Sequence, residues 1–283
     1  MNTKEMEIFA AKIRLETTKM IGKRGFGHLS GSLSVADVLA VLYCESGIMN
    51  IRPDVPDWPG RDKLVLSKGH AGPALYAALA MRGFFPMEWL ETLNQPGTRL
   101  PSHADRRLTP GVDMTTGSLG QGASAAAGIA LAQKMNDSAA RTFLILGDGE
   151  CNEGQVWEMA LFAQQHKLDN LITFVDYNKK QLDGTTSEVM EMDCIGEKFN
   201  AFGWRALVLD GGCVRTIREA IDGAHLLGRS ARPTCIVLNT TKGAKVPSIE
   251  AVEYNHHMVI EGDVYATALA ECEAELARLE VLK

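Results

Sequence analysis

The sequence predicts one α/β domain, residues 1–283, in which a central parallel sheet is covered by helices on both faces. Short runs of consecutive apolar residues, such as 142–146, 171–175 and 234–238, are separated by segments of helical length and pattern. Strands without polar alternation are buried on both sides, which is typical of parallel sheets between helical layers. The chain shows no internal repeat and no linker that would divide it, which favours a single domain.

The first part of the chain is expected to be mainly helical, with Ser34 as the N-cap of its second helix. Residues 94–118 hold Gly, Pro, Thr and polar residues without a clear period, so they predict a long loop. Such a loop inside a compact domain usually has a function. The elements expected before residue 119 are helices at 3–22, 34–46 and 72–82 and a short strand at 64–66.

From residue 119 onward, apolar strands are expected to alternate with helices. An Ala-rich helix at 119–134 comes first, and apolar residues at helical spacing between 269 and 279 predict a closing amphipathic helix. The elements expected between them are strands at 142–146, 171–175, 205–208 and 234–238 and helices at 153–167, 194–202 and 214–228.

The composition excludes several classes of protein. Hydrophobic residues (46%) and charged residues (23%) have the proportions of an ordinary globular protein. No stretch reaches the roughly 18 consecutive apolar residues of a membrane helix, and the first residues lack the apolar core of a signal peptide, so a cytoplasmic location is expected. A net charge of −6 without runs of like charge argues against nucleic-acid binding. The six cysteines form no Cys-x-x-Cys pair, which argues against a zinc site or a disulfide framework.

The strongest chemical signal begins where the strand at 142–146 ends, in Gly147-Asp148-Gly149 and the residues up to Gly154. In a parallel sheet, ligands bind at the carboxyl ends of the strands. The glycines on both sides of Asp148 allow an anion to approach the backbone, and the helix that follows is expected to point its amide-rich end at the same place. A single carboxylate beside phosphates suits a divalent cation that keeps phosphate oxygens as ligands.

Asn178 follows the next strand, thirty residues after Asp148. Adjacent parallel strands would place the two side chains together, so Asn178 offers a second oxygen ligand. Each feature also has a simpler explanation, because Gly-Asp-Gly commonly forms a tight turn and Asn commonly caps a turn or helix. Their combination at two neighbouring strand ends is less common by chance and favours a metal site.

The segment from Gly147 to Asn178 resembles the thiamine diphosphate and metal signature of an enzyme superfamily. The resemblance implies that Asp148, the Asn178 side chain and the backbone carbonyl of Lys180 hold Mg²⁺ or Ca²⁺, which bridges the diphosphate. It also implies that the amide of Gly149 contacts the diphosphate. A second Asn is common in the family motif, whereas here Tyr177 and Lys179 flank Asn178.

Three further segments resemble, in order and spacing, elements of the transketolase family, and the resemblance runs from about residue 8 to about residue 257. It implies a thiamine-diphosphate-binding fold in which three histidines face the sugar substrate, namely His28, His103 and His256. It places His70 against the cofactor, and Gly117 and Leu119 on the side of its aminopyrimidine ring. The segments are Gly27-His28 to Ser34, Leu66-Ser67-Lys68-Gly69-His70-Ala71, and Pro101-Ser102-His103 followed by Thr115 to Gly122.

Two positions of the resemblance leave alternatives open. The family usually has Trp-His where this chain has Asn255-His256-His257, so His257 is the alternative to His256. The resemblance gives Glu153 a place in the cofactor and catalytic site, and it places Glu153 and Glu158 in a carboxylate network that links two cofactor sites across a subunit interface. The alternative for both is a helix-start acid stabilised by the helix dipole.

Transketolases place the cofactor between a diphosphate-binding domain and a pyrimidine domain, and the latter supplies a glutamate that activates the cofactor. The sequence contains only the first of these domains. The resemblance therefore implies a partner, a C-terminal transketolase subunit, in an α2β2 assembly. The implied reaction transfers a two-carbon ketol unit from a ketose, such as a sugar phosphate, to an aldose acceptor.

Two alternatives differ in class. One is another thiamine diphosphate enzyme, of the 2-oxo acid dehydrogenase or deoxyxylulose phosphate synthase type. The Gly-His segments argue against the dehydrogenase, and the synthase is normally one long chain. The other is a non-catalytic remnant that keeps the fold, and retention of Asp148, Asn178 and the histidines argues against it. The sequence does not identify the sugar.

Overall fold

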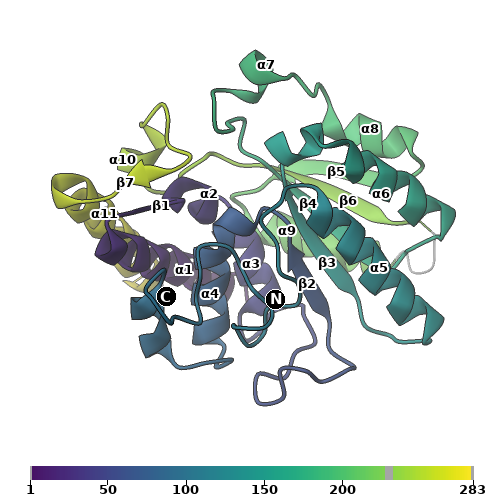
Figure 1. Cartoon of the computed structure of the whole chain (residues 1–283), viewed down its shortest axis with the longest axis horizontal. Coiled ribbons are helices and arrows are strands. Elements are labelled where there is room, and N and C mark those ends of the chain that lie inside the picture. The colour runs from purple at the N-terminus through teal and green to yellow at the C-terminus, as the bar shows by residue number, and fades with distance from the viewer. Residues whose placement is uncertain (1, 227–231, 282–283) are drawn as a thin grey trace.

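A five-stranded parallel sheet forms the centre of the chain (Figure 1). The computed structural model describes residues 2–226 and 232–281. The strands lie in the order β2-β3-β4-β6-β5, so the chain places β5 at one edge before it returns to insert β6 beside β4. The strands are β2 (Lys63–Leu66), β3 (Thr142–Gly147), β4 (Leu171–Tyr177), β5 (Arg205–Asp210) and β6 (Thr234–Asn239).

The central strands are apolar along their length because both faces of the sheet are covered. Successive side chains of a strand point to opposite faces. In β3, Phe143 and Ile145 therefore lie in one hydrophobic cluster, whereas Leu144 and Leu146 lie in the other. The edge strand β5 is less covered, and its Val208 side chain is 54% exposed.

The helices form a layer on each face of the sheet. Figure 1 shows α5, α6 and α8 on one side, and α1, α4 and α11 on the other. The first layer contains α5 (Gln121–Met135), α6 (Gly154–Gln165) and α8 (Ile195–Ala201). The second contains α1 (Thr3–Arg24), α3 (Ala36–Tyr43), α4 (Gly72–Met81), α9 (Val214–Leu226) and α11 (Gly262–Val281), and α11 packs along α1.

A second, two-stranded sheet joins distant parts of the chain. Strands β1 (Phe26–Gly27) and β7 (Met258–Val259) pair antiparallel, which brings His28 close to the residues that precede β7. The remaining short elements are α2 (Leu29–Leu33), α7 (Thr186–Val189), α10 (Pro247–Glu250) and the 3₁₀ turns η1 (Gly69–Ala71), η2 (Met87–Thr92) and η3 (Gly149–Asn152).

The strands and helices expected from the sequence are confirmed with shifts of a few residues, except around Ser34. There the chain forms the short helix α2, and α3 begins at Ala36 with Val35 at its N-cap. The Ser34 hydroxyl donates a hydrogen bond to the buried carboxylate of Asp176 at 2.7 Å. The N-cap prediction was wrong because a partner far along the chain binds this hydroxyl. Residues 227 and 228 of the helix expected at 214–228 lie outside the described residues.

Other expectations concern the loop, the cysteines and the membrane. The expected loop is confirmed, since residues 93–120 form one irregular segment between η2 and α5. All six cysteines are free thiols, and four of them are buried. Within residues 2–226 and 232–281, none of the helices combines the length and the apolar character needed to cross a membrane.

Phe174 tests the packing of the central sheet. It is fully buried in β4 and stacks on Phe143 of β3, with ring centroids 6.4 Å apart. Because truncation leaves a cavity between two fixed layers, Phe174→Ala is expected to lower the free energy of unfolding by about 3–5 kcal/mol. Urea denaturation measures this value. The control Val208→Thr, at the half-covered edge, is expected to change it by about 0.5 kcal/mol or less; equal losses in the two variants would contradict the packing described.

Candidate functional site

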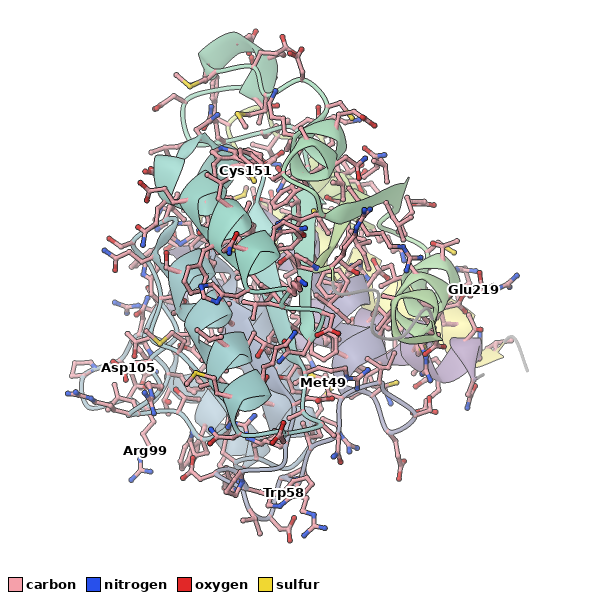
Figure 2. The ribbon with its side chains drawn as sticks, turned by 90° about the vertical axis from the view of Figure 1, so that its right-hand side faces the viewer. Met49, Trp58, Arg99, Asp105, Cys151 and Glu219 are labelled. Carbon is pink, nitrogen blue, oxygen red and sulfur yellow. The ribbon has the colours of Figure 1, made fainter. Side chains whose placement is uncertain are left out.

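The carboxyl ends of β2, β3, β4 and β6 surround a cavity of about 180 Å³. The residues that follow these strands line it, as expected for a parallel sheet whose connections diverge at this edge. Figure 2 shows this end of the sheet near Cys151, with Trp58 at the far end of the molecule. The lining residues are Gly31, Lys68, His70, Leu119, Gly147, Asp148, Gly149, Glu150, Asn178, Lys180, Gln181, Leu182, Lys242 and His256.

Asp148 lies directly after β3 and is only 3% exposed. Its carboxylate accepts hydrogen bonds from the backbone amides of Gly149 (2.8 Å) and Lys179 (2.6 Å). Burial, together with the negative charge of Asp176, raises the pKa of Asp148 to about 6. Burial makes the ionised form of this carboxyl group unfavourable, and a cation bound beside it would stabilise that form. The environment of Asp148 therefore suits a metal ligand.

The turn η3, and not a long helix, begins at Gly149, directly after Asp148. Helix α6 begins five residues later at Gly154, and its first residues do not line the cavity. The expectation that the helix end points its amides at the anion site stays a prediction. The backbone of Gly149 itself lines the cavity, and a Cβ on this residue would lie 2.8 Å from the Gln181 side chain.

Asn178 and Lys180 follow β4 and face the same cavity as Asp148. The register that pairs Gly147 with Asp176 brings these strand ends level, as expected. The backbone carbonyl of Lys180 accepts a hydrogen bond from the Lys242 ammonium at 2.9 Å, so this oxygen already faces a cation. One carboxylate, one amide oxygen and one carbonyl form the oxygen-rich set that Mg²⁺ or Ca²⁺ takes. In the part of the chain that the structure describes, no group of three or more His, Cys, Asp or Glu side chains could hold a metal.

The expected histidines form one cluster with His28 at its centre. Its ring centroid lies 5.3 Å from that of His70, 5.9 Å from that of His103 and 5.3 Å from that of His256. His103 comes from the irregular segment 93–120 and is exposed, whereas His70 and His256 line the cavity. The cluster therefore extends from the cavity to its outer rim.

His257 also contacts His28, with ring centroids 4.8 Å apart, but its ring packs on Phe26 rather than lining the cavity. His256 lines the cavity, and its Nδ1 lies 2.9 Å from the Lys242 Nζ. Because an ammonium group can only donate, Nδ1 accepts this bond and a neutral His256 carries its proton on Nε2. The geometry favours His256 over His257 at the cavity.

Burial lowers the pKa of four histidines of the cluster. It lowers the pKa of His28 to about 4, with a further contribution from His257, and that of His256 to about 3, where Lys242 adds to the effect. Partial burial also lowers the pKa of His103, although the residue as a whole is exposed, and burial holds the pKa of His70 well below the ordinary value. Neutral imidazoles can each accept one proton and donate another, as acid–base groups require.

Of the remaining expected residues, Leu119 lines the cavity, and Gly117, Glu153 and Glu158 lie outside its lining. Leu119 is 39% exposed. Gly117 has φ +149°, and a Cβ there would lie 3.1 Å from the His103 ring, so a larger residue would disturb this histidine. Glu153 and Glu158 are exposed on α6 and its N-cap, and Glu153 packs beside Gly120.

Glu150 is a buried site residue that was not predicted from the sequence. It is 2% exposed and accepts hydrogen bonds from the Ser67 hydroxyl, the Gly120 amide (2.8 Å) and the Gly147 amide (3.0 Å). Burial raises the pKa of this carboxyl group. Glu150 thereby joins the segment after β2, the start of α5 and the Gly-Asp-Gly turn. Its place in the turn was visible in the sequence, but its three donors were not.

Two buried lysines that were also missed line the cavity. Lys68 is 1% exposed and lies within the Leu-Ser-Lys-Gly-His segment; Lys242 is 3% exposed and belongs to no recognised motif. Burial, and then the charge of Lys68, lowers the pKa of Lys242 to about 8, so it remains mostly protonated at neutral pH. Together with Lys180 they put three lysines in the cavity lining beside the carboxylates of Asp148 and Glu150, and ammonium groups suit a diphosphate.

Comparisons with known proteins agree in sequence and in structure. The family model described as transketolase, thiamine diphosphate binding domain, matches residues 6–270. The 6-deoxy-6-sulfo-D-fructose transketolase subunit SqwG of Clostridium sp. (strain MSTE9) is 50% identical over 93% of this chain and 94% of its own length. An apulose-4-phosphate transketolase subunit of Phocaeicola vulgatus is 36% identical over 99% of this chain and 98% of its own.

Longer relatives match only in part. Human transketolase is 36% identical over 87% of this chain but 38% of its own length. The solved structure of transketolase from Campylobacter jejuni superposes with a TM-score of 0.88 at 27% identity, covering 99% of this chain and 46% of that chain. This chain thus spans less than half of these single-chain relatives.

The protonation of the histidine cluster is testable by NMR. In the folded chain, the ring resonances of His28 and His256 are expected not to titrate between pH 8 and about 5.5, because burial lowers the pKa of both rings. In urea, all histidines should titrate near pH 6.5. Since the unfolded chain binds these protons first, the two rings lower stability as the pH falls from about 6.5 toward 4. A folded-state midpoint between pH 6 and 7 for His28 would contradict this environment.

Proposed function

We propose, from the premise that this chain belongs to the transketolase family, that it forms the diphosphate-binding half of a two-chain enzyme. The chain is a thiamine-diphosphate transketolase subunit, so the reaction is the transfer of a two-carbon ketol unit from a ketose to an aldose. The observation that carries the proposal is the cavity where Asp148, Asn178 and the Lys180 carbonyl meet a cluster of neutral histidines.

In this proposal Asp148, the Asn178 amide oxygen and the Lys180 carbonyl hold Mg²⁺ or Ca²⁺, and the Gly149 amide contacts the diphosphate. When bound, thiamine diphosphate supplies an electron sink for the carbon–carbon bond that breaks. His70 lies against the cofactor, and Gly117 and Leu119 flank its aminopyrimidine side. Lys68 and Lys242 balance the charge that the diphosphate brings.

The histidines are proposed to bind the sugar and move its hydroxyl protons. His28 contacts every other histidine of the cluster, and His103 reaches the outer rim where a sugar would enter. His256, with its proton on Nε2, can donate a hydrogen bond to a hydroxyl or carbonyl oxygen. General acid–base help from such groups is worth about 10²–10⁴-fold in rate.

The substrate is proposed to be a ketose with a terminal anionic group. The two subunit relatives are named for 6-deoxy-6-sulfo-D-fructose and for apulose 4-phosphate, which carry a sulfonate and a phosphate. Comparing kcat/KM for ketoses that end in a sulfonate, a phosphate or a free hydroxyl would rank them. A preference for the uncharged ketose would contradict this substrate class.

A partner chain is proposed because the site on this chain is open. Ligand pockets for molecules of this size usually hold about 300–1,000 Å³, whereas this cavity holds about 180 Å³, enough for only part of the cofactor. Leu119 and Leu182 line it, yet 39% and 62% of their surfaces are exposed. The partner would cover these side chains with a pyrimidine domain and supply the glutamate that activates the cofactor.

The proposed assembly contains two copies of each chain and is cytoplasmic. Helix α6 lies on the side of the molecule that faces the viewer in Figure 2, and it carries Leu161 and Phe162, which are 56% and 38% exposed. An exposed apolar face of this kind suits a subunit contact. Glu153 and Glu158 lie on the same helix or its N-cap, which supports their proposed place in a carboxylate network between two sites.

The metal assignment is tested by Asp148→Ala. Loss of the one charged ligand is expected to weaken thiamine diphosphate binding to the assembled enzyme at limiting Mg²⁺ by at least tenfold, about 1.4 kcal/mol. Calorimetric titration measures the affinity. The exposed Asp54, in the connector before β2, serves as the control, and Asp54→Ala should bind as the wild type does. Equal affinities for wild type and Asp148→Ala would remove Asp148 from the metal site.

The partner requirement is tested by reconstitution. The purified chain alone is expected to show no ketol transfer, because only half of the cofactor site is present. Addition of the C-terminal subunit with cofactor and Mg²⁺ should restore activity, which saturates near one partner per chain. Robust transfer by this chain alone, in preparations free of contaminating transketolase, would refute the two-chain proposal.

A further inference from the structure

Asp176, near the end of β4, is fully buried, and its carboxylate accepts hydrogen bonds from side chains other than its ion-pair partner Lys68. Four side chains donate to its carboxylate, and three of them come from segments far away in the sequence. The donors are Lys68 Nζ (2.6 Å), Ser34 Oγ (2.7 Å), Asn178 Nδ2 (2.9 Å) and Thr240 Oγ1 (2.5 Å). Although burial alone would raise it, the Lys68 charge and these bonds hold the pKa of Asp176 below its ordinary value.

The bond from Asn178 fixes which way that amide points. An ionised carboxylate can only accept, so it binds the NH₂ group of Asn178 and excludes the amide oxygen from its side. Asn178 Oδ1 is therefore turned toward the Lys180 amide, at 3.2 Å, and Asn178 lines the cavity. This oxygen is the one that the proposed function assigns to the metal.

The bond from Lys68 fixes an ammonium group in the same cavity. Lys68 Nζ donates to Asp176 and to the Gly31 carbonyl at 2.9 Å. An ammonium group has three donors, so one remains for a ligand. Lys68 lines the cavity, whereas Asp176 itself does not.

We infer that Asp176 is a positioning residue that presents the Asn178 oxygen to the metal and the Lys68 ammonium to the diphosphate. It touches neither group and acts through both side chains. The inference rests on the proposed function, because it assumes that a metal and a diphosphate occupy the cavity. If Asp176 has this role, its negative charge and its acceptor oxygens increase the affinity for the metal. This effect is distinct from any effect of Asp176 on the free energy of unfolding.

Two substitutions separate these contributions. Asp176→Asn keeps the size and one acceptor oxygen but removes the charge, and Asp176→Ala removes both. With thiamine diphosphate present, Mn²⁺ binding to the enzyme reconstituted from this chain and its partner subunit is followed by electron paramagnetic resonance. It is expected to weaken in the order wild type, Asp176→Asn, Asp176→Ala, by at least tenfold for Asp176→Ala. Calorimetry should show a parallel loss of cofactor affinity.

Asp62 provides a matched control for a merely structural effect. It is 2% exposed, pairs with Arg141 at 2.6 Å and also accepts from the Asn50 and Arg141 amides, but it precedes β2 at the opposite end of the sheet. Figure 2 shows Met49, which precedes Asn50, well away from Cys151 at the site. Asp62→Asn should lower the melting temperature while Mn²⁺ affinity stays within about twofold of wild type.

The outcomes distinguish this inference from the function on which it rests. If wild type binds Mn²⁺ with the cofactor and folded Asp176 variants bind equally well, the positioning role is overturned and the proposed function stands. Equal affinity losses in the Asp62 and Asp176 variants would also overturn it. If wild type itself binds no Mn²⁺ with the cofactor, the proposed function fails. Should Asp176→Ala not fold, Asp176→Asn alone carries the test, because it keeps the size of the side chain, and it must still bind Mn²⁺ more weakly than wild type does.

Discussion

Glu150 and Asp176 are buried carboxylates at the carboxyl edge of the sheet. The hydrogen-bond donors that they require come from several segments of the chain and hold these segments together at the site. A buried carboxylate without partners is strongly unfavourable. Glu150 binds the segments after β2 and before α5. Asp176 binds Ser34, Lys68 and Thr240, which follow α2, β2 and β6. The motif segments, far apart in sequence, meet because these two acceptors lie at the ends of adjacent strands.

The same arrangement supports the proposal that the chain provides one half of a site that a partner completes. The sheet edge provides oxygen ligands and positive charge at the floor of a small cavity, and neutral histidines at its wall. Beyond them, Leu119 and Leu182 remain exposed. The inner part of the cavity is therefore polar, and its outer part is apolar and exposed. This arrangement suits a cofactor whose diphosphate binds in the inner part and whose ring end is covered by a second chain.

Local patterns predicted the sheet and the loop and led to the proposed metal-ligand positions, because each depends on a short run of sequence. Apolar runs marked β3, β4 and β6, and the residues at their ends gave Asp148 and Asn178. Long-range partners could not be read in this way. Ser34 has the sequence context of an N-cap but binds Asp176 across 142 residues, and no motif marks Lys242, which reaches the Lys180 carbonyl from the loop after β6. The family resemblance placed the histidines; only the structure showed that His28 lies at the centre of their cluster.

The ends of β3 and β4 are proposed to hold a divalent metal over which a diphosphate binds, and the rest of the proposed function depends on this metal. Anomalous diffraction from crystals of this chain grown with Mn²⁺ and thiamine diphosphate tests it most directly. We expect one strong Mn²⁺ peak within coordination distance of the Asp148 carboxylate, the Asn178 Oδ1 atom and the Lys180 carbonyl, with diphosphate oxygens completing the shell. A peak among the histidines around His28, or a diphosphate bound with no metal at Asp148, would contradict it.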